Sequence, residues 1–379
     1  MRCPRCGNED PRYFDVIKGR TYCRKCITFH RQFIDNDLNI RERPGHLYHV
    51  HYSLPFTLSD RQQFISDRLV ENYKAHKNTL ILAVCGSGKT EISFALIAYV
   101  LSIGQRVCFT VPRKALCVEL YERFCEHFSD LTIGLIYGGC TLHPEADLIL
   151  CTTHQLYRFC EVPFDLVLID EADAFPFYGD EVLNAMFMRC VKGQYVKMSA
   201  TLSSQDIGDE EVMIMNRRYH GHDLPVPVIR LILRPLWKVC LKYLIKKLRK
   251  NSNPILIYVP LKKDISEYTD FLSKTFRCRG VSSSSPDINE AISLLKNDSI
   301  DLIVTTTILE RGITIDNVQV IVMGAAHRVF DERTLIQIAG RVGRKENHAD
   351  GKIYFIDSCF SREMKSCIHT IEKLNHMSV

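Results

Sequence analysis

Short apolar runs alternate with segments of helical periodicity along most of the chain. In the first half we expect strands over residues 79–84, 106–111, 132–137, 147–152, 165–169 and 195–198, with a helix over 91–100. In the second half we expect strands over 254–259, 301–306, 318–323 and 352–356, with a helix over 264–275. Buried strands that alternate with helices predict parallel sheets with helices on both faces. The pattern therefore indicates two α/β domains in tandem.

Two stretches interrupt this pattern with proline, histidine and other polar residues. We therefore divide the chain into a module over 1–35, a connector over 36–56, a first domain over 57–215, a linker over 216–228 and a second domain over 229–379. Ser59 is the expected N-cap of the helix that opens the first domain. We assign no role to His46, His49 and His51 in the connector. A chain of 379 residues, of which 46% are hydrophobic, suffices for two or three packed cores.

The net charge is only mildly positive, with 49 Lys and Arg residues against 44 Asp and Glu residues. Such a balance permits an anionic partner without requiring one, so any nucleic-acid surface must be local. The chain opens without an apolar signal region, and no unbroken apolar run is long enough to span a bilayer. Of the 16 cysteines, only four are regularly spaced, and several of the others lie in apolar segments, as reduced thiols do. We therefore expect a cytoplasmic protein, or one attached peripherally to a membrane.

Four cysteines are regularly spaced, as the two Cys-x2-Cys pairs Cys3 with Cys6 and Cys23 with Cys26. This spacing predicts one tetrahedral Zn²⁺ site, and a redox pair is the minor alternative. The intervening residues are polar and aromatic, so the metal would supply much of the folding free energy. The basic and aromatic residues of the module suit contacts with phosphates and bases, but a structural zinc ribbon is an equal alternative. These residues are Arg5, Lys18, Arg20, Arg24, Lys25, Arg31, Tyr13, Tyr22 and Phe29.

A glycine-rich loop lies between the expected strand over 79–84 and the expected helix over 91–100, the arrangement that binds a nucleoside triphosphate. Backbone N–H groups surround the phosphates in such a loop, a lysine supplies positive charge and a threonine ligates Mg²⁺. Ala83 stands where the usual pattern has its first glycine. We expect an upstream glutamine to read the adenine edge, and choose Gln62 over Gln63. The predicted ATP-binding residues are Gln62, Gly86, Ser87, Gly88, Lys89 and Thr90.

The expected strand over 165–169 delivers acidic residues at its carboxyl end, where open α/β sheets bind their ligands. Asp170 is placed to hold Mg²⁺ and Glu171 to orient an attacking water. Ser199 and Thr201, after the expected strand over 195–198, form a hydroxyl pair that we expect to couple the ATP site to domain motion. Helix capping is the ordinary alternative for that pair.

Three other strand ends of the first domain offer cationic, hydroxyl or backbone N–H groups that suit a nucleic-acid backbone. Any one of them alone would be interpreted as an ordinary loop. The candidate DNA-binding residues are Arg113 and Lys114, Gly138 and Gly139, and Thr152 and Thr153.

The second domain has no phosphate loop of its own and instead carries Gln337, Arg341 and Arg344. Two arginines three residues apart in a glycine-flanked turn are suited to reach a γ-phosphate as arginine fingers. A cationic surface is the common alternative for isolated arginines.

Taken in order from about Leu58 to Ile356, these motifs resemble the core of helicase superfamily 2. The resemblance implies an α/β fold with two RecA-like parallel-sheet domains in tandem, here preceded by the small four-cysteine zinc module, with ATP between the domains. It implies that Lys89 and Thr90 bind phosphate and Mg²⁺, with Asp170 and Glu171 as the metal-binding and catalytic acids. It also implies that the two arginines sense the γ-phosphate with Gln337 nearby. The segments expected to line its nucleic-acid track include Arg113, Thr152, Thr153, Thr306 and Arg311.

Three features are similar to the ComFA family of competence ATPases, which help bring transforming DNA into bacteria. They are the cysteine module followed by residues 27–31, the extended acidic motif over 170–177 and the linker motif over 218–227. The resemblance implies an ATP-dependent single-stranded DNA translocase that acts in DNA uptake with partner proteins and uses ATP, Mg²⁺ and Zn²⁺. We see no inserted wedge to split a duplex, so translocation is favoured over strong unwinding.

Other functions remain open at this point. Residues 170–173 read Asp-Glu-Ala-Asp, as in DEAD-box RNA helicases, but Gln337 stands where those proteins usually carry His-Arg. A primosomal or repair-type DNA helicase is therefore nearer than an RNA helicase. The non-enzyme alternative is a zinc-tethered DNA-binding scaffold with a vestigial ATP site, and the intact Lys89, Asp170 and Glu171 argue against it.

Overall fold

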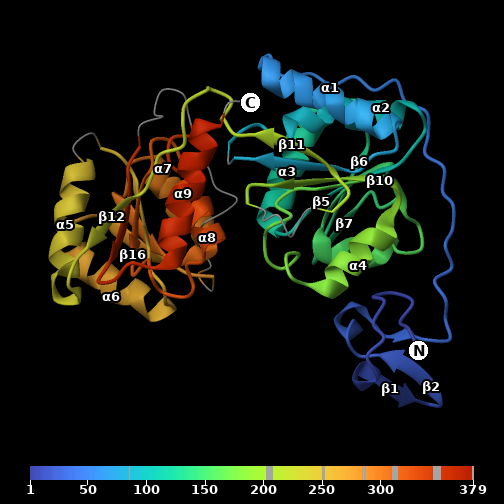
Figure 1. The fold of residues 1–379 in the computed structure, drawn as a ribbon, viewed down its shortest axis with the longest axis horizontal. Coiled ribbons are helices and arrows are strands. Elements are labelled where there is room, and N and C mark those ends of the chain that lie inside the picture. Colours follow the sequence, from blue (N-terminus) through green and yellow to red (C-terminus); the bar gives the residue numbers. More distant parts are fainter. Residues whose placement is uncertain are drawn as a thin grey trace. The chain divides into compact units, whose positions relative to one another are not determined.

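The computed structural model describes residues 1–84, 86–201, 208–249, 252–283, 285, 287–309, 315–344 and 351–377. The chain divides into two compact units (Figure 1). Unit 1 comprises Met1–Ala83 and Gly88–Ile214, and unit 2 comprises Val84–Ser87 and Met215–Val379. Each unit is built on its own sheet. Among the described residues, no helix is both long enough and apolar enough to span a bilayer.

The sheet of unit 1 contains the six strands that the sequence predicts and two more. The strands are β4 (Thr79–Ala83), β5 (Val107–Val111), β6 (Ile133–Tyr137), β7 (Cys140–Leu142), β8 (Leu148–Thr152), β9 (Phe164–Ile169), β10 (Val191–Ser199) and β11 (Glu211–Met215). Their order is β11-β4-β10-β9-β5-β8-β6-β7. All neighbours from β4 to β6 pair in parallel. The short β7, which was not predicted, returns antiparallel on β6.

Helices of unit 1 follow the strands in alternation, as expected. They are α1 (Asp60–Lys74), α2 (Phe94–Ser102), α3 (Lys114–His127) and α4 (Glu181–Cys190), with the 3₁₀ helices η3 (Glu91–Ser93) and η4 (Thr153–Phe159). Ser59 is the N-cap of α1, as predicted, and forms a capping box with Gln62. The helix predicted over 91–100 is a turn of 3₁₀ helix that continues as α2.

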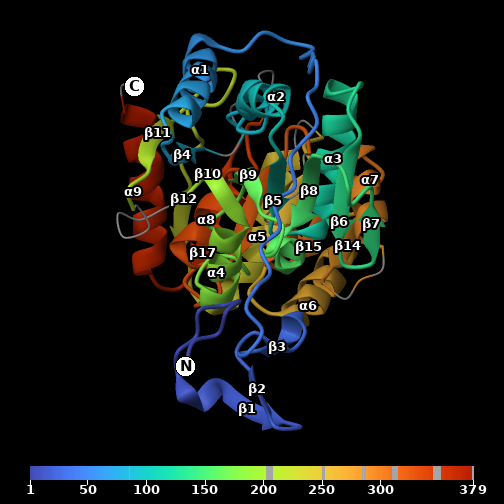
Figure 2. The ribbon, with the colours of Figure 1, turned by 90° about the vertical axis from the view of Figure 1, so that its right-hand side faces the viewer.

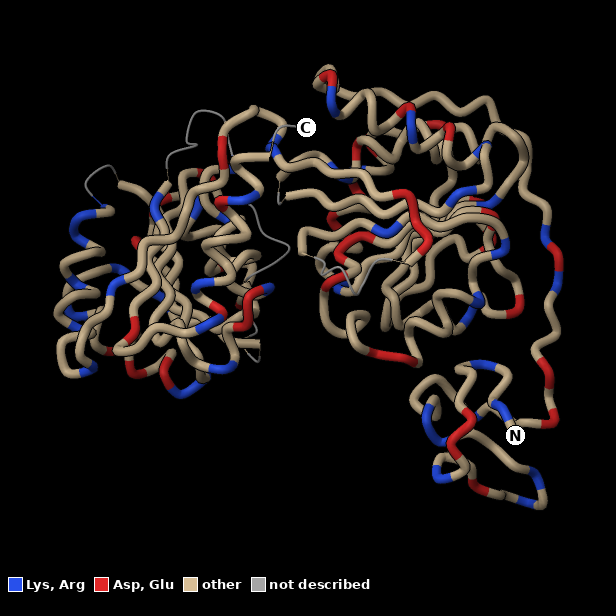
Figure 3. The backbone as a smooth tube through the Cα atoms, in the orientation of Figure 1, with Lys and Arg blue, Asp and Glu red and all other residues tan. Residues whose placement is uncertain are grey.

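The amino-terminal module is a small antiparallel sheet, which the sequence did not predict (Figure 2). Its elements are η1 (Pro11–Tyr13), β1 (Phe14–Ile17), β2 (Arg20–Cys23), η2 (Ile27–Phe29) and β3 (Gln32–Phe33). It carries both positive and negative residues, and several form pairs, such as Arg12 with Asp10 and Arg20 with Asp35 (Figure 3). Its four regularly spaced cysteines are all buried. The module therefore has little apolar core beyond these sulfurs.

The connector between β3 and α1 contains no helix or strand, yet it is held on unit 1 by a buried carboxylate. Asp147, which is 1% exposed, accepts hydrogen bonds from the backbone N–H and the imidazole of His46 and from the hydroxyl of Tyr48. Its other oxygen lies 3.6 Å from Arg43 and 3.8 Å from the buried Arg106. The connector thus supplies partners for two charges that the sheet buries.

Unit 2 is a six-stranded sheet in which every pair of neighbours is parallel. The strands are β12 (Val228–Leu231), β13 (Ile255–Tyr258), β14 (Cys278–Val281), β15 (Leu302–Thr305), β16 (Gln319–Met323) and β17 (Ile353–Asp357), in the order β12-β17-β16-β13-β15-β14. The four predicted strands are confirmed. The sequence missed β12 and β14, and it assigned the first residue of β12 to the linker over 216–228.

Helices cover both faces of this sheet (Figure 1). They are α5 (Trp237–Leu248), α6 (Lys262–Ser273), α7 (Ile288–Lys296), α8 (Glu332–Ala339) and α9 (Arg362–His376). On β13, Leu256 and Tyr258 pack with α7, α8 and α9, whereas Ile255 and Ile257 pack with α5 and α6. Successive side chains of a strand point to opposite faces, so an uninterrupted apolar strand builds two cores.

The buried carboxylate generates a stability prediction. Replacing Asp147 with alanine leaves the buried Arg106 without its carboxylate and releases the connector, which we expect to cost about 3–5 kcal/mol. Urea denaturation followed by circular dichroism measures the loss, and Asp130→Ala, at an exposed position, is the matched control. Equal midpoints for the two variants would contradict the proposed role of Asp147.

The same carboxylate predicts a pH dependence. Burial alone would raise the pKa of Asp147, but the hydrogen bonds from His46 and Tyr48 outweigh it and hold the pKa below its ordinary value. The charged form is therefore favoured by folding, and its contribution is complete above the unfolded pKa of about 4. We expect the difference between wild type and Asp147→Ala to shrink as the pH falls below about 4.

Candidate functional site

The phosphate loop follows β4 and has the backbone that its glycines predict. Gly86 and Gly88 adopt φ angles of 82° and 81°, in the left-handed region that favours glycine. A side chain at residue 88 would also collide with Gln62 Nε2. Ser87 and Thr90 are buried, and Cys85 lies outside the described residues. Glycine is therefore required at residue 88 both by conformation and by the approach of Gln62.

Gln62 has a structural partner in addition to its position beside the loop. Its Oε1 accepts a hydrogen bond of 2.9 Å from the backbone N–H of Ser59, as the third residue of the capping box. The capping box fixes the side chain at the start of α1, with its Nε2 next to Gly88. The predicted adenine-reading residue thus lies beside the phosphate loop, and its capping role was not foreseen.

The acidic motif lies at the carboxyl end of β9, beside Lys89. Lys89 Nζ is 3.6 Å from Asp170 Oδ1, and both side chains are largely buried. The backbone N–H of Asp170 donates to the carbonyl of Thr110 on β5, and Asp170 Oδ1 accepts from the N–H of Glu171. Glu171 has a φ of 55°, an uncommon backbone conformation for a residue other than glycine. The structure therefore brings together the predicted phosphate-binding lysine and the predicted metal-binding acid.

The hydroxyl pair after β10 is tied to the same acidic motif. Ser199 Oγ and the backbone of Thr201 exchange hydrogen bonds of 3.1 Å, and Thr201 Oγ1 donates to Asp173 Oδ2 at 2.5 Å. Both hydroxyl residues are buried. The pair thus does not cap a helix of the described residues but connects the ends of β9 and β10.

The three candidate DNA-binding loops lie at the carboxyl ends of β5, β6 and β8, on the same edge of the sheet. Lys114 is exposed, with Nζ 4.6 Å from the ring centre of Tyr137 at the end of β6. Gly138 and Gly139 form the turn from β6 into β7, and space is open beside both Cα atoms. Arg113 is the partly exposed N-cap of α3.

The threonines after β8 differ from these exposed groups. Thr152 is the last residue of β8, Thr153 is the first of η4, and both are buried. Among the described residues, Thr153 Oγ1 has no hydrogen-bond partner. Because their side chains are buried, Thr152 and Thr153 present backbone groups rather than exposed hydroxyls at this edge of the sheet.

The candidate residues of unit 2 surround the end of α8. Gln337 lies in its last turns and is buried, as is Arg341 just beyond its end. Gly343 has a φ of 70°, and Arg344 Nε donates to the carbonyl of Gly340. We call Gly340–Arg344 the arginine turn. Thr306 follows β15, and Arg311 lies outside the described residues.

Sequence reasoning missed two residues that contact the arginine turn. Arg218 donates hydrogen bonds to the carbonyls of Gly340, Val342 and Gly343, and His220 Nε2 lies 3.2 Å from the carbonyl of Gly343. In the sequence analysis they belong only to the linker motif over 218–227. Their contacts join residues more than a hundred positions apart, so no local pattern signals them.

The four cysteine sulfurs of the module lie within 4.8 Å of one another. The distances from Cys3 Sγ to Cys26 Sγ and from Cys6 Sγ to Cys23 Sγ are 3.8 and 3.7 Å. Four sulfurs at ~2.3 Å from a tetrahedral Zn²⁺ would be about 3.8 Å apart, so the cluster fits this metal.

Within unit 1, the module contacts the α/β domain beside the candidate DNA-binding threonines. The Phe29 ring is stacked on His154, with centroids 6.0 Å apart, and lies 5.8 Å from Tyr157. Both partners belong to η4. Lys25 pairs with Glu181, and Arg189 donates to the carbonyl of Arg5, so α4 also holds the module.

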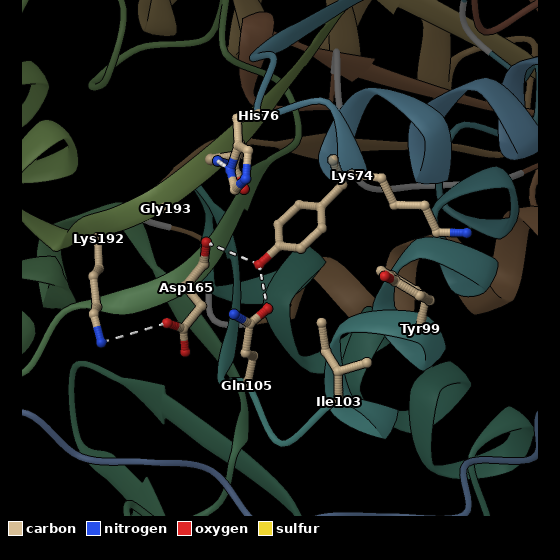
Figure 4. Close-up of a pocket in the computed structure, with 10 residues that line it drawn as sticks. Lys74, His76, Tyr99, Ile103, Gln105, Asp165, Lys192 and Gly193 are labelled. Atoms are coloured by element: carbon tan, nitrogen blue, oxygen red, sulfur yellow. Dashed lines mark hydrogen bonds and ion pairs between the residues drawn. The ribbon is translucent and has the colours of Figure 1, made fainter.

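A pocket of about 520 Å³ lies away from these residues, near the amino ends of β9 and β10 (Figure 4). The hydroxyl of Tyr73 donates to Gln105, and Lys192 lies 3.8 Å from Asp165. No predicted site residue lines it. The phosphate loop follows the carboxyl end of β4, so it lies at the opposite edge of the sheet from this pocket.

Family models match both α/β domains. Residues 55–204 match the type III restriction enzyme res subunit model, and residues 238–346 match the helicase conserved C-terminal domain. Among solved structures, Saccharomyces cerevisiae Dbp5 bound to RNA and ADP BeF3 is similar with a TM-score of 0.57, 16% identity and coverage of 84% of this chain and 92% of that one. RecG bound to a three-way DNA junction is similar with a TM-score of 0.58 and 18% identity, and the match covers 86% of this chain and 48% of that one. These likenesses confirm two RecA-like domains in tandem.

Two curated relatives are similar over nearly their whole length. The competence protein ComFA of Streptococcus pneumoniae is 30% identical over 98% of this chain and 90% of its own. ComFA of Bacillus subtilis is 32% identical over 100% of this chain and 86% of its own. The ATP-dependent DNA helicase RecG of Aquifex aeolicus is more distant, with 25% identity over 78% of this chain and 41% of its own. The chain is 30% and 32% identical to the two ComFA proteins over both helicase domains and the cysteine module, and it therefore belongs to the ComFA family of competence proteins.

Proposed function

We propose that this protein is an ATP-driven translocase on single-stranded DNA that acts in DNA uptake during natural transformation. The observation that carries the proposal is the similarity to ComFA over nearly the full chain, together with the Lys89–Asp170 pair beside a glycine-rich loop. It would act together with partner proteins of the uptake machinery. We place the protein in the cytoplasm or at the inner face of the membrane.

The residues of the phosphate loop would bind ATP through complementary charge and backbone donors. Gly86, Ser87 and Gly88 offer N–H groups to the phosphates, and Lys89 offers its ammonium group. Gln62, fixed beside Gly88 by its capping bond, would contact the adenine edge.

The acidic motif fits a divalent cation and an attacking water. Asp170 and the hydroxyl of Thr90 are the oxygen donors that would hold Mg²⁺, which when bound neutralises phosphate charge. Glu171 would orient the water for attack on the γ-phosphorus. Its φ of 55° turns the chain directly after Asp170.

Arg341 and Arg344 would contact the γ-phosphate when the domains close, and Gln337 would lie near it. Closure and release in each cycle would shift the grip on a strand, as hinge motions around a ligand do. The bonds from Thr201 to Asp173 and Ser199 support a coupling role for the hydroxyl pair, because they connect the acidic motif to β10.

Single-stranded DNA would follow the edge formed by the ends of β5, β6 and β8. Arg113 and Lys114 would contribute positive charge, and the open turn at Gly138 and Gly139 would let a phosphate approach backbone N–H groups. Thr152, Thr153, Thr306 and Arg311 complete the proposed track.

The cysteine module would hold Zn²⁺ through Cys3, Cys6, Cys23 and Cys26. The metal would supply the folding free energy that a module with so little apolar core lacks. Because Phe29 packs on His154 and Tyr157, the folded module would support the start of η4, directly after the proposed DNA contacts at Thr152 and Thr153.

We predict that Lys89→Ala abolishes ATP hydrolysis stimulated by single-stranded DNA, with kcat reduced by at least about 100-fold, because a preorganised charge on the phosphates is lost. Steady-state phosphate release with and without DNA measures this effect. Lys74→Ala, at an exposed lysine of α1, is the matched control and should retain activity.

Other outcomes of that assay would redirect the proposal. Stimulation by RNA but not by DNA would favour an RNA helicase and contradict a role in DNA uptake. No hydrolysis under any condition would favour the DNA-binding scaffold. Robust unwinding that does not depend on duplex length would show a helicase rather than a translocase alone.

We predict that Cys23→Ser releases zinc and weakens stimulation by single-stranded DNA, whereas ATP hydrolysis without DNA persists. Phe29→Ala should retain zinc but raise the DNA concentration needed for half-maximal stimulation, because the contact with η4 is lost. Metal analysis and DNA titration of the ATPase activity separate the two effects. Cys125→Ser, at an exposed cysteine outside the module, is the control. Unchanged DNA titrations for both variants would assign the module to another partner.

A further inference from the structure

The first part of the expected linker is bound tightly to unit 2. Asn216 Nδ2 donates to the carbonyls of Leu374 and Met377 near the end of α9. Leu224 and Asn375 exchange hydrogen bonds of 2.8 and 2.9 Å. Between these two anchors lies Arg218, which is only 2% exposed. This segment is therefore part of the unit and not a free tether.

The guanidinium of Arg218 bonds to the backbone of the arginine turn before Arg341 and between Arg341 and Arg344. Its Nη1 donates to the carbonyl of Val342 at 2.6 Å and also to that of Gly343, and its Nη2 donates to the carbonyl of Gly340 at 3.2 Å. These carbonyls belong to the peptide groups immediately before Arg341, after Val342 and before Arg344. One side chain thus fixes three of the peptide planes that determine where the two arginines point.

These carbonyls follow the carboxyl end of α8, where the backbone has more acceptors than donors. A cation is favoured there by the helix dipole, and the planar guanidinium supplies several donors in a fixed fork. Lysine has a single nitrogen and could not reproduce this geometry. The carbonyl of Gly340 also accepts from Arg344 Nε at 3.2 Å, so Arg218 and Arg344 share an acceptor.

We propose that Arg218 is a positioning residue that holds the arginine turn in the conformation required for Arg341 and Arg344 to act on the γ-phosphate, with His220 as a second, weaker contact. This inference rests on the proposed function of the two arginines. The three hydrogen bonds of Arg218 described above all go to backbone carbonyls of the arginine turn, and through these bonds Arg218 acts on the turn.

Chain connectivity gives the arrangement a further consequence. Arg218 lies three residues after β11, and β11 neighbours β4, the strand that leads into the phosphate loop. A displacement of β11 would therefore reach the arginine turn through three peptide units and one guanidinium. Three residues of the chain therefore connect the end of β11 with the guanidinium that binds the arginine turn.

The adjacent arginine provides a matched control. Arg217 is exposed, and its hydrogen bond among the described residues goes to the nearby carbonyl of Gly221. We expect Arg218→Ala to lower the DNA-stimulated kcat by about 10- to 100-fold, the range for a misplaced catalytic group, with the KM for ATP and the affinity for single-stranded DNA within about twofold of wild type. Arg218→Lys should not restore kcat, and Arg217→Ala should leave all three quantities unchanged.

Thermal unfolding of each variant checks that the fold persists. If Arg218→Ala does not fold, Arg218→Lys and His220→Ala, which remove less of the network, carry the test through the same kcat and KM measurements. A raised KM with normal kcat would mean that Arg218 serves ATP binding, and would overturn the proposal. So would normal kinetics in a folded Arg218→Ala variant.

A double-mutant cycle distinguishes positioning from an independent role. If Arg218 acts through the turn, adding Arg218→Ala to Arg344→Ala lowers kcat much less than it does in the wild-type background. Additive losses would overturn the proposal. If Arg341→Ala and Arg344→Ala both retain full kcat while Lys89→Ala does not, the arginine-finger part of the proposed function fails, and this inference fails with it.

Discussion

Parallel pairing of β4, β10, β9 and β5 is the constraint on which the candidate site depends. Parallel strands deliver their carboxyl ends to one edge of a sheet, so segments far apart in the sequence meet there. Lys89, beyond the loop that follows β4, and Asp170, at the end of β9, are separated in the chain by 80 residues yet lie 3.6 Å apart. The bond from Asp170 N to the Thr110 carbonyl extends the same pairing one residue past the strand. A register shift of one residue would turn Asp170 to the other face of the sheet.

The sequence predicted the sheets well because buried parallel strands read as uninterrupted apolar runs. It missed β12, which is partly exposed, and the short strands β7 and β14, because their residues lack that signal. The phosphate loop and the acidic motif were predicted because their function depends on local spacing. Arg218 was missed as a contact because its partners lie 122 to 125 residues away and are backbone atoms, which carry no sequence signature.

Long-range contacts also explain what the sequence left open for the amino-terminal segments. The connector carries histidines that looked like surface residues, and His46 is largely exposed, yet its Nδ1 bonds to one of the most buried carboxylates of the sheet. The basic and aromatic residues of the module looked equally suited to DNA and to solvent. Phe29 packs on η4, and Lys25 pairs with Glu181, so part of that set is used in attaching the module to unit 1. Lys18, Arg24 and Arg31 are also exposed and remain able to meet a ligand.

A second ion pair explains how the phosphate loop tolerates an acidic residue next to Thr90. Glu91 opens the helical segment that follows the loop and is buried, so its charge lies where a phosphate would also be attracted. Arg123 on α3 donates a hydrogen bond directly to Glu91 Oε1. The charge of Arg123 then offsets that of Glu91, so this pair adds no net charge behind the phosphate loop. Without Arg123, Glu91 would repel the phosphates at a distance where a low-dielectric surrounding makes like charges costly. One arginine thus neutralises an acid behind the phosphate loop, and another, Arg218, binds the turn that carries the two arginines proposed to meet the γ-phosphate.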